Sequence, residues 1–151
     1  MNYAVVGFGT AGYHAVKAIR TCDKEGEIDV YSNTSRAPYN PMLTTYYAFG
    51  KLEFDGLFPF GDLDQIRKEI SFHLIQEPVI RVHAKEHLVE TKQKTKQYDR
   101  ILIATGARAF APPVKGLDPE DAFLMRTVED SIRFKERLKQ KNVRHAVVIG
   151  A

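Results

Sequence analysis

A short apolar run near the N-terminus leads directly into three closely spaced glycines. Residues 3–6 are β-branched or apolar, and residues 7–12 read GFGTAG. From Thr10 the spacing of the apolar residues becomes helical. A strand, a glycine-rich turn and a helix are therefore expected in direct succession, which is the context in which the pattern GxGxxG is informative. The helix is predicted to place Ala11, Ala15, Ala18 and Ile19 on one side and Lys17 and Arg20 in water.

Each glycine of this turn has a separate predicted role. Gly7 permits the tight turn, Gly9 lets the backbone approach a pyrophosphate, and Gly12 lets the helix pack closely on the strand. A phosphate would then lie at the helix N-terminus, where unpaired N–H groups and the helix dipole favour negative charge. The alternative is a glycine-rich turn that binds nothing.

The second predicted strand, residues 28–31, ends without the acidic residue that usually accompanies such a turn. An Asp or Glu about 20 residues after the glycines ordinarily binds the ribose hydroxyls. Here the count reaches Ser32 and Asn33. Asn33 can donate and accept hydrogen bonds, so it remains a candidate ribose ligand, and its other interpretation is a turn residue.

A second signal lies in residues 98–106, YDRILIATG. It reads as a buried strand that ends in Ala104, Thr105 and Gly106. Small residues there would let the backbone pass close to a ligand held at the first turn, although taken alone the segment suits any core strand.

The rest of the chain alternates strands, helices and loops. Residues 54–61, FDGLFPFG, form a predicted loop with its Phe side chains folded underneath, and residues 92–95 form a hairpin turn. Asp62 and Thr127 are predicted helix N-caps, Thr127 in a capping box with Asp130. The expected helices cover residues 44–49, 62–70 and 127–141, and the further strands cover residues 72–75, 79–83, 87–91, 96–105 and 146–149.

Composition narrows the class of protein. The chain has 151 residues, 44% hydrophobic and 27% charged, with a net charge of +3, which suits a globular protein and gives no basis for binding nucleic acid or a membrane. Residues 1–6 leave no room for a secretory signal, so a cytoplasmic location is expected. Cys22 has no partner for an internal disulfide, and His83 and His87 alone make a poor metal site, so no metal is expected.

Taken together, these motifs resemble the pyridine nucleotide–disulfide oxidoreductases. The resemblance rests on YDRILIATGARAFAPPVKGL, FLMRTVEDSIRFKERL and VVIG, which occur in the order typical of the family. It implies an α/β fold: a Rossmann-like FAD-binding domain with a parallel sheet, helices and an inserted antiparallel hairpin or meander. The branch with nitrite reductase and rubredoxin or ferredoxin reductase-like enzymes is the most similar, through residues 38–45.

The resemblance also implies positions for the cofactor. The glycine turn would hold the FAD pyrophosphate, Asn33 would lie at the adenosine ribose, and Val79 would meet the adenine through its backbone. Thr105, Gly106 and Arg108 would pass near the cofactor, and residues 40–45 would approach the flavin, although Pro41 stands where an Arg is usual. The implied cofactor-binding residues are Gly7, Gly9, Thr10, Ala11, Gly12, Asn33, Asn40, Pro41, Thr45, Val79, Ala104, Thr105, Gly106 and Arg108.

No catalytic side chain is predicted. Met42 occupies the position of the redox cysteine in the coenzyme A-disulfide reductase-like branch, and Cys22 is interpreted as a small buried or capping residue. Electrons from NAD(P)H would therefore pass through the flavin directly to an external acceptor, a small redox protein or a partner domain.

The resemblance divides the chain into residues 1–110, an incomplete FAD-binding domain, residues 111–126, a linker, and residues 127–151, the beginning of an NAD(P)H-binding domain. HAVVIGA, residues 145–151, would be the first strand and first glycine of that domain. The chain would then be the front part of a longer enzyme and inactive alone. The C-terminal strand is expected to fill the open sheet edge of its own molecule or pair with a second copy in a homo-oligomer. The alternative is a non-catalytic dinucleotide-binding module that is complete at 151 residues.

Overall fold

The computed structural model describes residues 1–118, 122–140 and 143–149. The chain forms two compact units. The first contains Met1–Asn40 and Phe58–Ala107, and the second contains Pro41–Leu57 and Arg108–Ala151. No helix in the described ranges combines the length and the apolar character needed to cross a membrane.

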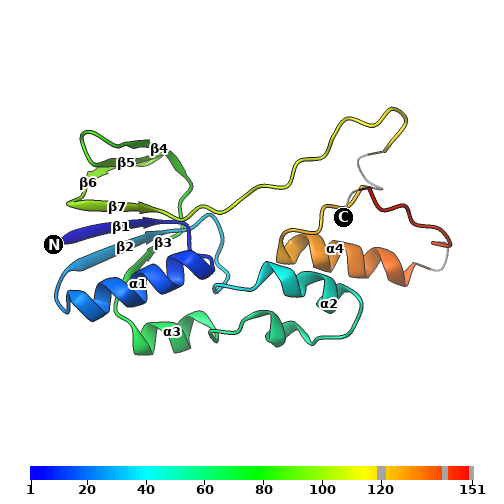
Figure 1. The fold of residues 1–151 in the computed structure, drawn as a ribbon, viewed down its shortest axis with the longest axis horizontal. Coiled ribbons are helices and arrows are strands. Elements are labelled where there is room, and N and C mark those ends of the chain that lie inside the picture. Colours follow the sequence, from blue (N-terminus) through cyan, green and yellow to red (C-terminus); the bar gives the residue numbers. More distant parts are fainter. Residues whose placement is uncertain (119–121, 141–142, 150–151) are drawn as a thin grey trace. The chain divides into compact units, whose positions relative to one another are not determined.

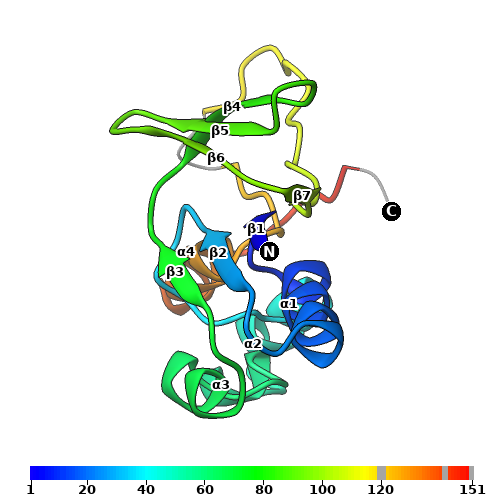
Figure 2. The same ribbon diagram turned by 90° about the vertical axis from the view of Figure 1, so that its left-hand side faces the viewer.

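The first unit is built on a parallel sheet of four strands, in the order β3-β2-β1-β7 (Figures 1 and 2). The strands are β1 (Asn2–Val6), β2 (Glu27–Tyr31), β3 (His73–Ile75) and β7 (Arg100–Ile103). Val6 pairs with Tyr31 on one side and with Ile103 on the other, and Tyr31 pairs with Ile75. The carboxyl ends of all four strands therefore meet at one edge of the sheet.

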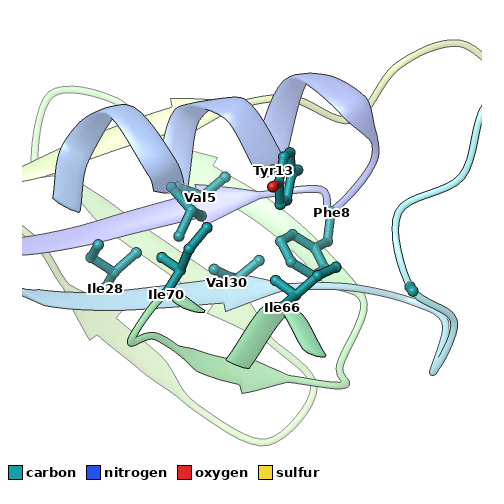
Figure 3. Close-up of a cluster of buried hydrophobic side chains, with 9 residues drawn as sticks. Val5, Phe8, Tyr13, Ile28, Val30, Ile66 and Ile70 are labelled. Carbon is teal, nitrogen blue, oxygen red and sulfur yellow. The ribbon is translucent and has the colours of Figure 1, made fainter. Parts of the chain in front are cut away.

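Helices α1 (Thr10–Cys22) and α3 (Leu63–Glu69) contribute to the core on one face of this sheet (Figure 3). Val5, Ile28 and Val30 face these helices, and they alternate along their strands with residues that face the other side of the sheet. Asp62 begins α3 as predicted, because its carboxylate accepts a hydrogen bond from the Gln65 N–H at 2.8 Å. The buried residues of this core are Val5, Phe8, Tyr13, Val16, Ile28, Val30, Ala37, Ile66 and Ile70.

The predicted buried face of α1 is wrong. The structure buries Gly12, Tyr13 and Val16, and it leaves Ala11 and Ala18 exposed. The close approach of the helix at Gly12 turns the larger side chains inward, whereas alanine tolerates either side of a helix. Arg20, expected in water, is half-buried and donates to the backbone oxygens of Ser71, Asp23 and Gly26.

The inserted antiparallel element is a three-stranded meander over the other face of the sheet (Figure 1). It consists of β4 (Val79–His83), β5 (Leu88–Thr91) and β6 (Thr95–Gln97). The predicted turn at residues 92–95 is confirmed by the Thr91 N–H, which donates to the Lys94 oxygen at 2.9 Å. A second core joins the two layers through Ala4, Val6, Tyr31, Val89 and Tyr98.

The expected single strand over residues 96–105 is two strands in two different sheets. The first, β6, pairs with β5, and β7 pairs with β1. The chain crosses between the layers at Tyr98, which is buried, and at Asp99, whose carboxylate accepts from the Asn2 N–H at 2.7 Å. The sequence pattern does not reveal this crossing, because the residues before it and the residues after it both have the composition of a strand.

The second unit contains η1 (Pro41–Leu43), α2 (Thr44–Ala48), η2 (Phe54–Leu57) and α4 (Val128–Lys139). The two α-helices pack through Phe49 and Phe134, whose ring centroids lie 6.0 Å apart. Thr127 caps α4 in the predicted capping box with Asp130. The Phe side chains of residues 54–61 are half-buried, as expected.

The predicted strand at residues 146–149 is absent from the described part of the chain. Val147 and Val148 are 89% and 87% exposed, and residues 143–149 have no regular secondary structure. The strand that the expected edge pairing needs is therefore not formed in these residues. A strand needs a hydrogen-bonded neighbour, and apolar composition alone does not supply one. Lys141, Gly150 and Ala151, which belong to the predicted helix end and the second glycine turn, lie outside the described residues.

Candidate cofactor-binding site

The predicted glycine turn lies at the carboxyl edge of the parallel sheet, between β1 and α1. The segments that follow β2, β3 and β7 begin at the same edge. Their backbones are joined one residue beyond the strands: Gly7 N–H donates to Tyr31 O at 2.8 Å, Ser32 N–H to Ile75 O at 3.0 Å, and Ala104 N–H to Val6 O at 2.7 Å. Open α/β sheets bind ligands outside this edge, where the strand order reverses.

Gly7 and Gly12 are required by close packing. Gly7 has a φ of 104°, and a Cβ on it would lie 2.7 Å from the Ala104 carbonyl carbon and 3.0 Å from the Thr105 Cα. A Cβ on Gly12 would clash with the Gly7 carbonyl. The structure thus brings the turn and the end of β7 into direct contact, whereas the sequence predicted only that small residues after β7 would pass close to a ligand.

Gly9 has a different environment. A Cβ on this residue would meet no atom within 4 Å, and its backbone is extended, with a φ of −91°. Gly9 is the N-cap of α1 and gives the helix no side-chain cap, so the first N–H groups of Thr10 and Ala11 face an exposed end. Open space beside an uncapped helix N-terminus fits a pyrophosphate, and the residues present therefore fit the phosphates of a dinucleotide.

The adenosine side of the predicted site comes from the segments that follow β2 and β3. Asn33 is exposed two residues after β2. Val79 is half-buried at the first position of β4 and packs against the core between the two layers. Both residues belong to the first unit, and their roles toward a ligand remain predictions.

The remaining predicted ligands divide between the two units. Asn40 is half-buried at the end of the first segment of the first unit, and Gly106, with a φ of 68°, follows β7. Pro41 begins η1 in the second unit, where Thr45 is exposed on α2, and Arg108 is exposed in a segment without regular structure. Their predicted contacts with the flavin remain predictions.

Sequence reasoning missed a buried polar cluster around Asp29, in the middle of β2. Its carboxylate accepts hydrogen bonds from Lys96 Nζ at 2.8 Å and Tyr98 Oη at 2.7 Å, and it lies 3.3 Å from His73 Nδ1. Tyr98 Oη also lies 2.6 Å from Tyr31 Oη. The cluster ties the meander that carries Val79 to the sheet. The available signal was one charged residue inside an otherwise apolar strand, because such a charge needs partners.

These contacts keep Asp29 ionised. Burial raises the pKa of its carboxyl, but the hydrogen bonds from Lys96 and Tyr98 and the charge of Lys96 outweigh burial, so the net pKa lies below the ordinary value. The hydrogen bond to Asp29 raises the pKa of Lys96. Burial, with the hydrogen bonds to Tyr31 and Asp29, strongly raises the pKa of Tyr98.

The thiol and imidazole groups were also singled out from the sequence. Cys22 is exposed at the last position of α1, so of the two interpretations, a buried or a capping residue, the buried one is wrong. Met42 lies on η1 and is 77% exposed. His83 Nε2 contacts Glu90 Oε2 at 2.9 Å. Within the described ranges, no group of three or more His, Cys, Asp or Glu side chains could hold a metal ion.

Comparison with known proteins identifies the family of the chain. The family model described as pyridine nucleotide-disulphide oxidoreductase matches residues 1–151. The chain belongs to this family. Pyridine nucleotide-disulphide oxidoreductases are FAD-dependent, so the cofactor expected from the glycine turn is the cofactor of the family.

The relatives are consistent with the branch suggested by residues 38–45. The chain is 28% identical over 99% of its length to the epsilon subunit of NADH-dependent phenylglyoxylate dehydrogenase from Aromatoleum evansii, and it covers 35% of that protein. It is also 28% identical over 99% of its length to the large subunit of nitrite reductase (NADH) from Escherichia coli, and it covers 18% of that subunit.

The fold is shared with solved structures. NADH:rubredoxin oxidoreductase from Clostridium acetobutylicum superimposes with a TM-score of 0.78 and 22% identity, over 93% of this chain and 36% of that one. The chain therefore spans about a third or less of the length of these relatives.

Proposed function

We propose that the protein is an FAD-dependent NAD(P)H oxidoreductase and that this chain supplies its FAD-binding part. The observation that carries the proposal is the open space at Gly9, beside the uncapped N-terminus of α1 and the end of β7. A family of FAD-dependent enzymes that matches the whole chain supports it.

In this proposal the Thr10 and Ala11 N–H groups donate to the pyrophosphate, and Gly7 and Gly12 hold the turn against β7 and α1. Asn33 and Val79 lie along the adenosine half of the cofactor. Bound FAD supplies the acceptor for the nicotinamide's hydride and the donor of electrons for the next protein. The residues of the chain bind and orient this group.

We further propose that no cysteine takes part in the electron transfer. The exposed Met42 stands at the position of the redox cysteine, and Cys22 lies at the far end of α1 from the glycine turn. The acceptor is a small redox protein or a partner domain, in keeping with the name of the rubredoxin oxidoreductase of similar fold.

The division of the chain follows from the same proposal. Residues 1–110 form an FAD-binding domain that is completed by further chain, residues 111–126 form a linker, and residues 127–151 begin the NAD(P)H-binding domain. Residues 1–151 alone are then inactive, because the nicotinamide site is not contained in them.

The test uses the protein expressed from its whole reading frame. We expect it to purify with a flavin absorption spectrum that is bleached by NADH or NADPH under anaerobic conditions. A colourless protein that takes up no FAD on reconstitution would contradict the proposal. A flavin that NADH and NADPH both leave oxidised would instead favour a binding module without redox catalysis.

A further inference from the structure

One carboxylate oxygen of the protein is buried without a partner. Glu77 Oε2 has almost no accessible surface and makes no hydrogen bond to any part of the chain that the structure describes. Buried polar atoms nearly always have a partner, so an exception calls for an explanation, such as a ligand. Glu77 as a whole is half-buried, so its carboxylate gains a partner from a molecule that binds later only if the side chain turns outward, and leaving an unsatisfied buried position favours that turn.

Glu77 lies at the carboxyl edge of the parallel sheet. It stands two residues after β3 and two residues before Val79, the predicted adenine contact. The segment after β3 adjoins the segment after β2, since Ser32 N–H donates to Ile75 O at 3.0 Å. The negative charge of Glu77 also acts on Tyr31, the last residue of β2, where it helps to raise the pKa of the phenol.

The acidic residue expected at the end of β2 is missing from this chain, and Glu77 lies at the same edge. Dinucleotide sites of this architecture usually hold the ribose hydroxyls with an Asp or Glu at the end of the second strand. In this chain that position is Asn33, which is exposed. Glu77 brings an acidic group to the same edge from the neighbouring strand end.

The chemistry of the group restricts its ligand. An ionised carboxylate only accepts hydrogen bonds, so its partner must be a donor. Phosphate is excluded by like charge, and the pyrophosphate has its own place at the N-terminus of α1. The adenosine half of a dinucleotide carries two kinds of donor, the ribose hydroxyls and the exocyclic amine of adenine.

We infer that the Glu77 carboxylate accepts a hydrogen bond from the adenosine half of the bound FAD, in place of the acid that is missing at Asn33. The inference rests on the proposed function, because it assumes that FAD occupies this edge. It predicts that Glu77 contributes to cofactor affinity and contributes nothing to the stability of the free protein.

The test measures competition for the FAD site of the apoprotein made from the whole reading frame. Displacement of FAD, followed by flavin fluorescence, is compared for ADP, 2′-deoxy-ADP and inosine diphosphate. Glu77→Ala should lower the affinity for ADP at least about tenfold. Glu77→Gln should lower this affinity less, because the amide keeps one acceptor oxygen. The matched control is Glu86→Gln, an exposed residue in the turn between β4 and β5, which should behave as wild type.

The analogues identify the donor. If the ribose hydroxyl donates, Glu77→Ala should discriminate less than wild type between ADP and 2′-deoxy-ADP, and if the amine donates, it should discriminate less between ADP and inosine diphosphate. Either result supports the inference, provided that the melting temperature of the apoprotein stays at or above the wild-type value.

Three results would overturn it. Unchanged ADP affinity in Glu77→Ala refutes the role of Glu77 and leaves the proposed function standing. A marked fall in the melting temperature of the free Glu77→Ala protein assigns the carboxylate to the fold. A wild-type protein that binds neither FAD nor ADP removes both the inference and the proposed function.

Discussion

Single residues in the glycine turn differ in what a side chain would meet. Gly7 and Gly12 face backbone atoms of the protein, whereas a Cβ on Gly9 would enter open space. The same motif therefore contains two glycines that the fold needs and one, Gly9, whose open surroundings we propose to be the space for a ligand. This difference makes Gly9 the residue at which binding can be separated from folding.

We predict that Gly9→Val abolishes FAD binding without unfolding the protein. The valine would occupy the space expected for the pyrophosphate, so the affinity for FAD should fall by at least ~100-fold. The φ of −91° suits any residue, and the poorer N-cap should cost at most about 1 kcal/mol. Fluorescence titration measures the binding, and the thermal midpoint of the apoprotein measures the fold.

Gly12→Ala provides the contrast. Its Cβ would collide with the Gly7 carbonyl, so the apoprotein itself should be destabilised. If Gly9→Val retains FAD at wild-type affinity, the turn does not hold the pyrophosphate.

The buried Asp29 supports a prediction about stability. Asp29→Asn should lower the free energy of unfolding at pH 7 by about 2–3 kcal/mol, because it removes a charged acceptor from Lys96 and Tyr98. Urea denaturation measures the loss. Glu27→Gln, an exposed change on the same strand, should stay close to wild type.

The dependence on pH follows from the lowered pKa of Asp29. Its contribution is complete above the ordinary value of 3.8 and is lost as the pH falls further, through the lower pKa of the folded state. The difference between wild type and Asp29→Asn should therefore shrink as the pH falls below about 4. A difference that grows as the pH falls below 4 would contradict this assignment.

At the scale of elements, the buried hydroxyl of Tyr98 is one of the links between the meander and the parallel sheet. Tyr98 follows β6, and its Oη contacts both Asp29 and Tyr31 of β2. The strands of the meander otherwise pair only with one another. Its docking on the sheet therefore depends on this cluster and on the second core, which includes Val89.

We predict that Tyr98→Phe loosens the meander more than the sheet. The loss of the hydroxyl leaves Asp29 and Tyr31 short of a partner, at a cost of about 1–3 kcal/mol. Hydrogen exchange should accelerate at the amides of β4, β5 and β6 more than at those of β1 and β2. Tyr46→Phe, which alters an exposed tyrosine of α2, is the control, and an equal change in all strands would argue against a separate docking role.

For the whole molecule, the open question is the route of the electrons. The relatives include proteins named as NADH-dependent oxidoreductases, and this chain brings one cysteine, exposed at the end of α1. In the proposed function Met42 takes the position of the redox cysteine, so we expect the flavin alone to pass the electrons on.

We predict that alkylation of every thiol leaves dye reduction nearly intact in the protein made from its whole reading frame. Cys22 is exposed, so iodoacetamide should reach it in the native state. The rate with NADH or NADPH and an artificial acceptor measures the effect, and Cys22→Ser is the matched variant. Inactivation that follows the modification of Cys22, and that Cys22→Ser prevents, would refute the mechanism without cysteine.

The sequence by itself determined the local features of this protein. The first strand, the glycine turn and α1 follow one another as predicted, and Asp62 and Thr127 begin their helices, because caps and tight turns depend on residues within one turn of chain. The role of Gly12 also followed from the motif, since its nearest neighbour, the Gly7 carbonyl, lies within the strand–turn–helix unit, whereas Gly7 faces Ala104 and Thr105 after β7.

Only the tertiary structure decided the features that depend on distant residues. The division of residues 96–105 between two sheets, the buried face of α1 and the exposed tail at residues 143–149 all depend on which strand or helix lies alongside. Asp29 meets Lys96 and Tyr98 across 67 and 69 residues of chain. Glu77 likewise shows its unpaired oxygen only once the segments after β2 and β3 come together, because burial is a property of the packed molecule and not of a local pattern.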